Sequence, residues 1–251
     1  MSRSTGSNHA DGIANTVRLS NDMVKLVVGK GRKDFLVHRT AIAKASPVLQ
    51  AAFRSNTWKE GRARTMVLPD DDPETIQMLL HFAYVGRLPN LNTDDDYSSI
   101  GNDHRGQYDG LARLYCVGEK YQNKDFKNAT IDAMLSKVAI RDNEGSRWFP
   151  SSPAIKIIYN GTPEGSKARK LMVDIYVYGV GAANIVAYTL HLDFIKDLIA
   201  ALTKILLDGE IPFFREERLW IPSCEYHEHA SGECCGSGER LTKDIRGRTP
   251  L

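Results

Sequence analysis

Hydrophobic and polar positions between residues 35 and 53 predict a strand, a short helix and a second helix in close succession. Residues 34–37 form a short apolar run typical of a strand, and helical spacing begins soon after it. Ser46 followed by Pro47 is a start signal for the second helix, because a serine side chain accepts a hydrogen bond from an unpaired amide and proline has no such amide. The predicted apolar face of this helix comprises Val48, Leu49, Ala52 and Phe53.

Helical spacing also dominates the rest of the chain. The polar block at residues 87–107 predicts a surface loop. Two helices follow, with apolar faces at Leu111, Leu114, Tyr115, Val117 and Tyr121 and at Phe126, Ala129, Ala133 and Val138. Residues 153–159, 167–178 and 190–207 predict three more helices, and the last of them has a wide apolar stripe. We expect that helix to pack on the first half of the chain; the alternative is that it fills a groove on a partner protein.

The order of these elements resembles the BTB/POZ domain family, and neighbouring motifs extend the resemblance. The matching segments are a first strand at 21–28, a hairpin turn at 29–31, the loop Trp58-Lys59-Glu60-Gly61, a third strand at 65–68 and an acidic helix opening at 70–74. The resemblance covers residues 20–140. It implies an α+β fold, in which a small mixed sheet is covered by helices, followed by a mostly helical region.

The resemblance also predicts how the chain is divided. We expect a disordered tail at residues 1–19, a BTB/POZ-like domain at 20–140, a helical extension at 146–210 and a second tail at 211–251. No repeat of propeller or solenoid length follows the first domain. The chain is therefore similar to short fungal BTB/POZ proteins, which lack the kelch propeller or zinc-finger array that animal relatives often append.

Composition narrows the classes of function. The net charge of +2 is too mild to predict direct binding to nucleic acid. The N-terminus has no apolar core of the kind a secretory signal needs, and Asp174 and Asn184 interrupt the most apolar window, which argues against a membrane span. Four cysteines in 251 residues do not resemble a secreted disulfide scaffold, so we expect a cytoplasmic or nuclear protein.

The motifs of the common enzyme classes are not found in the sequence. There is no nucleophile-elbow serine and no phosphate-binding GK[ST] loop, and the glycine pairs at 29–31 and 179–181 lack the third glycine of a dinucleotide site. The resemblance instead implies protein–protein interaction without catalysis. We expect a self-associating adaptor that links a target to a cullin-type ubiquitin ligase; the alternative is a nuclear scaffold in transcriptional or chromatin control. A homodimer is also implied by the resemblance.

Two pairs of residues are implied as partner-binding sites. Trp58 and Glu60 resemble the family's contact motif for the cullin scaffold, and an exposed aromatic ring beside a carboxylate suits a small hot spot. The alternative is that Trp58 packs on the core and Glu60 is solvated. Asp22 and Arg39 match the charged pair that lines the pocket of corepressor-recruiting members. The alternative for this pair is a partly buried salt bridge that supports only the fold.

A cluster of metal-ligand residue types lies near the C-terminus. Cys224, His227, His229, Cys234 and Cys235 offer thiolate and imidazole groups, and four of these five could surround a structural zinc ion. The two histidines are only two positions apart, which suits an extended segment better than a helix. The alternative is a reduced, mobile tail without metal.

Overall fold

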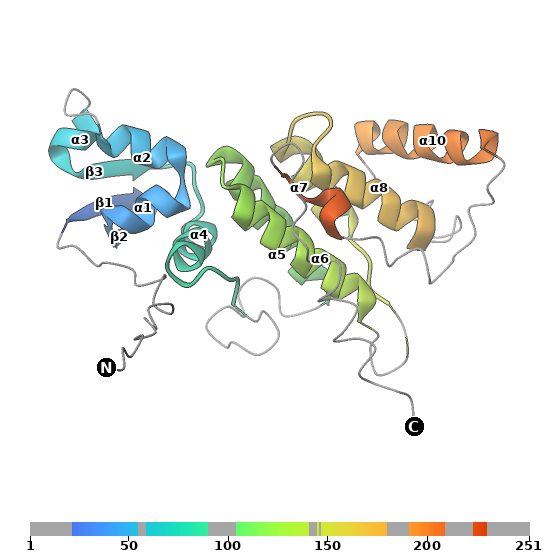
Figure 1. Ribbon diagram of the computed structural model, residues 1–251, viewed down its shortest axis with the longest axis horizontal. Coiled ribbons are helices and arrows are strands. Elements are labelled where there is room, and N and C mark those ends of the chain that lie inside the picture. Colours follow the sequence, from blue (N-terminus) through green and yellow to red (C-terminus); the bar gives the residue numbers. More distant parts are fainter. Residues whose placement is uncertain are drawn as a thin grey trace, which may run out of the picture.

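The computed structural model describes residues 22–54, 59–89, 104–140, 145, 147–179, 191–208 and 223–229. From the first strand to α10 the elements follow one another along the long axis of the molecule, and residues 223–226 return to its middle (Figure 1). A small sheet with its helices lies at one end, α5 (His104–Lys120) and α6 (Lys124–Ala139) lie in the middle, and α10 (Leu192–Leu207) lies at the far end. The α+β architecture expected from the sequence, a small sheet with helices followed by a helical region, is confirmed.

The sheet has three strands and is mixed. Its strands are β1 (Met23–Val28), β2 (Lys33–His38) and β3 (Thr65–Leu68), in the order β2-β1-β3. Strand β1 pairs antiparallel with β2 and parallel with β3. Val24, Leu26 and Val28 alternate along β1 and are buried, so this face of the sheet carries the helices.

Three short helices follow the two-stranded hairpin, where the pattern predicted two helices and then a loop at residues 58–61. They are α1 (Arg39–Ala45), α2 (Pro47–Arg54) and α3 (Lys59–Ala63). Ser46 is fully buried, and its Oγ accepts a hydrogen bond of 3.1 Å from the amide of Leu49. The Ser46-Pro47 start signal is therefore confirmed. Val48 differs from its predicted place on the apolar face, because it is 43% exposed while Leu49 and Phe53 are buried.

Helix α4 (Pro73–Val85) has a polar cap at each end. Asp72 accepts a hydrogen bond of 3.0 Å from the amide of Thr75. Gly86 ends the helix in the left-handed region, at φ 76°, which a residue with a Cβ adopts only with strain. Ile76, Leu79, Leu80 and Ala83 are buried as the acidic opening and helical spacing predicted.

Helices α5 (His104–Lys120) and α6 (Lys124–Ala139) form an antiparallel pair beside α4. Asn123 joins the pair to the first half: its Oδ1 caps α6 at the amide of Phe126, while its Nδ2 donates to the carbonyls of Lys44 and Ala45 at 3.1 and 2.9 Å. The polar loop predicted at 87–107 extends too far toward the C-terminus, because α5 already begins at His104. Residues 90–103 lie outside the described part of the chain.

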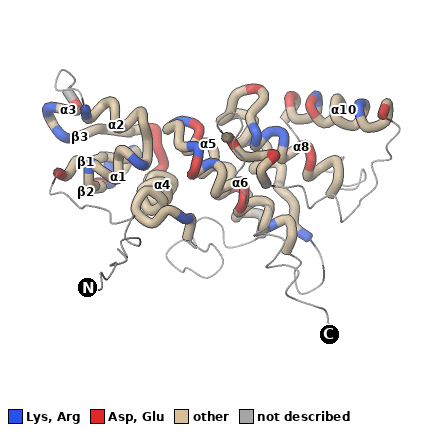
Figure 2. The backbone as a smooth tube through the Cα atoms, in the orientation of Figure 1, with Lys and Arg blue, Asp and Glu red and all other residues tan. Residues whose placement is uncertain are grey.

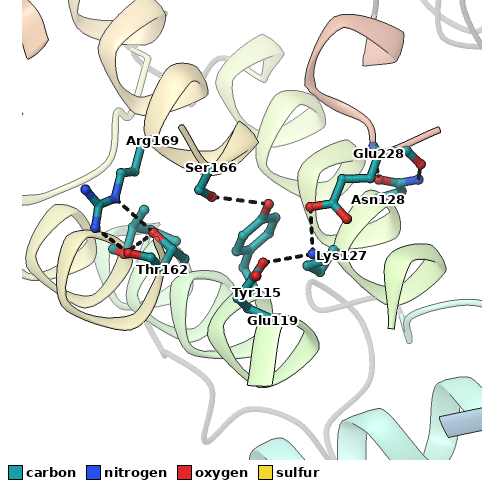
Figure 3. Close-up of polar contacts among 9 residues, drawn as sticks. Tyr115, Glu119, Lys127, Asn128, Thr162, Ser166, Arg169 and Glu228 are labelled. Carbon is teal, nitrogen blue, oxygen red and sulfur yellow. Dashed lines mark hydrogen bonds and ion pairs between the residues drawn. The ribbon is translucent and has the colours of Figure 1, made fainter. Parts of the chain in front are cut away.

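Helices α7 (Ser152–Gly161) and α8 (Lys167–Gly179) follow, and an arginine joins them. Arg169 on α8 donates to the carbonyl of Tyr159 at 2.8 Å and also contacts the carbonyl of Thr162 (Figure 3). Carbonyl groups at a helix C-terminus have no partner within the helix, so a guanidinium there satisfies them. The turn between the two helices is thus held by charge-assisted hydrogen bonds.

Helix α10 (Leu192–Leu207) packs on α7 and α8, not on the first half of the chain. The ring of Phe194 contacts Tyr159 and Tyr176 edge to face, at centroid distances of 5.6 and 5.1 Å. The expectation that this helix covers the first domain was therefore wrong. The aromatic partners on α7 and α8 lie closer in sequence and already fill that side of the helix. Four large apolar side chains of α10 stay exposed: Leu192, Ile199, Leu206 and Leu207.

The C-terminal region contributes one further element to the core. The short 3-10 helix η3 (Ser223–Tyr226) packs between α6 and α8, and Tyr226 is fully buried. A tail was expected for the whole of 211–251, but residues 223–229 pack against α6 and α8, with Tyr226 and His227 buried. None of the described helices is both long and apolar enough to cross a membrane.

We predict that Gly161→Ala destabilises the protein by about 1–3 kcal/mol, the usual cost of overpacking. A Cβ at Gly161 would overlap the Sγ of Cys116 on α5 and lie 3.0 Å from its Cβ, so two helices would have to separate. Gly31→Ala is the control, since no atom lies within 4 Å of its added Cβ. Thermal unfolding of both variants measures the difference, and equal melting temperatures would contradict the close packing of α5 and α7.

Candidate protein-interaction sites

Asp22 and Arg39 form an ion pair at the point where β1 begins and β2 ends. The carboxylate Oδ2 of Asp22 lies 3.4 Å from Nη1 of Arg39, and the backbone amide of Arg39 donates to the carbonyl of Asp22 at 2.9 Å. Arg39 also donates to the carbonyl of Phe53 at 2.7 Å, and Arg64 lies 3.1 Å from Oδ1 of Asp22. The pair therefore joins β1, α1 and α2 and the residue that precedes β3, as its structural alternative requires.

The same side chains remain accessible to a partner. Asp22 is 35% and Arg39 is 38% exposed, so each presents part of its charged group at the surface. A partly exposed pair contributes little to stability, because solvent screens the attraction. Binding of a partner by Asp22 and Arg39 stays a prediction.

Glu60 lies in the first turn of α3 and is half-buried. Helix α3 packs against α2 and β3, at the sheet end of the molecule (Figure 1). Trp58, its predicted partner in the contact motif, lies outside the described residues, as do the three residues before it. The structure therefore places the carboxylate of the motif at the domain surface but does not test the motif itself.

Exposed apolar side chains occur on the outer face of the sheet. Leu36 is 69% and Val67 is 49% exposed. Leu36 is paired with Lys25 and Val67 with Val27, and paired residues share a face of a sheet, so both side chains lie opposite the helix-covered face. The sequence gives only a weak signal that Leu36 and Val67 are exposed, because a leucine or valine in a strand is more often buried.

Charged residues of both signs are interspersed over the described part of the chain (Figure 2). No end of the tube is covered by one sign alone. Local ion pairs, rather than one broad field, therefore dominate the electrostatics around each surface feature.

The structure brings together the three described members of the predicted Cys/His cluster, with the rings of His227 and His229 edge to face at a centroid distance of 5.7 Å. Sγ of Cys224 lies 3.2 Å from Nε2 of His229, whereas the buried His227 contacts Oδ1 of Asp132 on α6 at 2.9 Å. Within the described residues, no group of three or more His, Cys, Asp or Glu side chains could hold a metal ion. Cys234 and Cys235 lie outside those residues, so zinc binding that uses them stays a prediction.

A buried lysine fixes the segment that carries these residues. Lys127 on α6 is 6% exposed, and its Nζ lies 2.8 Å from Glu119 and 2.6 Å from Glu228 (Figure 3). Burial alone lowers the pKa of this lysine, but its hydrogen bonds to the two carboxylates outweigh the effect and raise the pKa. Lys127 therefore remains charged. Sequence reasoning missed it, since a lysine within a helix usually belongs to the solvated face.

A tyrosine anchors the same segment on α8. The hydroxyl of Tyr226 donates to Asp174 at 2.8 Å, and Nζ of Lys170 lies 4.9 Å from the centre of its ring. Burial and the nearby Asp174 carboxylate raise the pKa of Tyr226, so the hydroxyl is neutral and acts as a donor. The only sequence signal for this anchor is one aromatic residue in a polar segment.

Comparison with known proteins identifies the first half. Residues 17–103 match the BTB/POZ domain family. Kelch-like protein 21 of Rattus norvegicus is 40% identical over 58 residues, which are 23% of this chain and 10% of that protein; the Homo sapiens protein gives the same values. Kelch-like ECH-associated protein 1A of Danio rerio is 42% identical over 55 residues, 22% of this chain and 9% of its own length.

Residues 17–103 of the chain are therefore a BTB/POZ domain. A BTB/POZ domain is a protein-interaction module and not a catalytic one. The chain spans about a tenth of the length of the relatives above. Helices α5 to α10 and η3 lie beyond the matched residues.

We predict that His227→Ala lowers the free energy of unfolding by about 1–3 kcal/mol, since it removes a buried ring and leaves Asp132 without this contact. His229→Ala is the matched control and costs less, because His229 is only half-buried. Chemical unfolding with and without a zinc chelator measures both. Equal, chelator-sensitive losses in the two variants would instead show that both histidines bind a metal.

Proposed function

We propose that the protein is an adaptor that links a target protein to a cullin-type ubiquitin ligase. The BTB/POZ domain carries the proposal, and the similarity to Kelch-like proteins supports it. The position of Glu60 in the first turn of α3, at the domain surface, is consistent with a role in binding the cullin scaffold. In this proposal Trp58 supplies the apolar anchor and Glu60 the charged contact at the edge.

An apolar side chain is exposed on helix α2, against which α3 packs. This side chain is Val48, which is 43% exposed. Interfaces of this kind need a small apolar centre with a polar rim. In the proposal Trp58 supplies the centre and Glu60 part of the rim.

The helical half gives the proposed adaptor a fixed geometry. Helix α5 contacts both α4 of the first half and α7 of the second, and buried residues form one continuous core across all of them. A target bound by the helical half would therefore be held at a constant distance from the cullin scaffold. We further propose that the adaptor self-associates and acts in the cytoplasm or nucleus.

We predict that Trp58→Ala and Glu60→Lys each weaken binding to a cullin scaffold, Trp58→Ala by roughly 30-fold, which corresponds to a hot spot of about 2 kcal/mol. Glu60→Lys acts by replacing an attractive charge with a repulsive one. Co-purification with tagged cullin, followed by titration of the purified proteins, measures the losses.

The matched control is Glu164→Lys, which makes the same change of charge at an exposed position of the second half. Its binding should equal that of the unmodified chain. Unchanged binding by both Trp58→Ala and Glu60→Lys, with melting temperatures also unchanged, would contradict the cullin proposal.

A further inference from the structure

Residues 223–229 lie between α6 and α8 in the way that a short peptide lies in a groove. The segment contacts both helices, and the residues directly before and after it are outside the described part of the chain. Its contacts to the groove are made by side chains of α6 and α8. The groove can therefore be described by what it recognises.

The centre of the groove recognises a tyrosine. Tyr226 is fully buried, its hydroxyl donates to Asp174, and the ammonium group of Lys170 lies against its ring. A phenylalanine would fill the same space but would lack the hydroxyl that donates to Asp174, which would then keep only Lys170 as a partner. The groove thus distinguishes a tyrosine from other aromatic residues by a partly buried hydrogen bond.

The rim recognises the peptide backbone. Oδ1 of Asn128 accepts from the amide of Glu228 at 2.9 Å, and Nδ2 of the same residue donates to the carbonyl of Glu228 at 3.1 Å (Figure 3). Lys167 donates to the carbonyl of Glu225 at 2.8 Å. These contacts bind an extended chain whatever its side chains are.

Two acidic positions are recognised by lysines. Glu225, directly before the tyrosine, lies 2.7 Å from Lys170, and Glu228, two residues after it, lies 2.6 Å from Lys127. The lysine on α6 is buried and the one on α8 is partly exposed. The charges of segment and groove are therefore complementary on both sides of the tyrosine.

Each of these lysines also has a carboxylate partner on its own side of the groove. Lys127 keeps Glu119 on α5 at 2.8 Å, and Lys170 keeps Asp174 on α8 at 2.6 Å. A buried cation that loses its partner is strongly destabilising. Here neither lysine loses all its partners when residues 223–229 leave, so the groove can be emptied and filled again.

The segment belongs to the same chain as the groove, because residues 209–222 join Asp208 to Ser223. A segment of the same chain competes with outside peptides at a raised effective concentration. Residues 223–229 would therefore occupy the groove until a peptide of higher affinity or higher concentration displaced them.

We infer that the groove between α6 and α8 is a binding site for a target peptide with an acidic residue directly before a tyrosine and another two residues after it. Residues 223–229 occupy the site within the chain, and the target peptide replaces them. The inference rests on the proposed adaptor function, for which it supplies the target-binding site. It is independent of the cullin contact, which lies on the first half.

The test uses the full chain and a fluorescein-labelled peptide of residues 221–231, with Ser in place of Cys224. Glu228→Lys in the chain places a cation beside Lys127 and so weakens the chain's own segment. We expect this variant to bind the labelled peptide at least about tenfold more tightly than the unmodified chain, by fluorescence anisotropy. Tyr226→Ala is a second releasing variant, and peptides with Tyr226→Phe or Glu228→Lys should bind weakly to both.

Two controls separate peptide exchange from a general loss of structure. Adding Lys170→Glu to the Glu228→Lys chain should abolish peptide binding, whereas Lys196→Glu on the exposed face of α10 should not. Hydrogen exchange at residues 223–229 reports whether the segment has left. Release without peptide binding overturns the inference, and so does a segment that stays protected in both releasing variants, because it is then a fixed part of the core. Neither result would affect cullin binding.

Discussion

The close approach of α5 to α6 and α7 is the constraint on which the rest of the structure depends. Gly118 on α5 leaves room for α6, where an added Cβ would lie 2.7 Å from Cγ of Lys127, and Gly161 on α7 leaves room for Cys116 of α5. Helices that lack a Cβ at the crossing can pack at short range and bury more apolar surface. Tyr108, Leu111 and Leu114 of α5 are buried as a result, and the core runs without a break from α4 to α8.

The same approach explains why a lysine is buried there. The stem of Lys127 crosses α5 at Gly118, which brings its ammonium group to Glu119, the next residue of α5. The desolvation of a lysine is costly unless carboxylates replace its water. Glu119 and Glu228 are these two carboxylates. Gly118 thus fixes where Lys127 lies, and Lys127 in turn binds Glu228, about a hundred residues later in the chain.

The elements that could be predicted from the sequence are those whose signals are local. Ser46 before Pro47 and Asp72 before Pro73 mark helix starts by hydrogen bonds that span three residues, and the structure has those bonds. The docking of 223–229 could not be predicted, because its anchor pairs Tyr226 with Asp174, 52 residues apart, and the segment is otherwise polar. Of the candidate site, the Asp22–Arg39 pair could be predicted from resemblance, whereas Lys127 carries no sequence signal that separates it from a solvated lysine.

The sequence boundary near residue 140 is therefore not a boundary of the packed structure. Asn123 donates to the carbonyls at the end of α1, and α5 packs on α7, so the BTB/POZ domain and the helical half share side chains in one core. A hinge requires few contacts between the two parts that it joins. Here helix α5 packs against both α4 of the first half and α7 of the helical half. For an interaction protein the consequence is geometric: a partner at the sheet end and a segment in the groove between α6 and α8 are held at a separation set by rigid helices rather than by a linker.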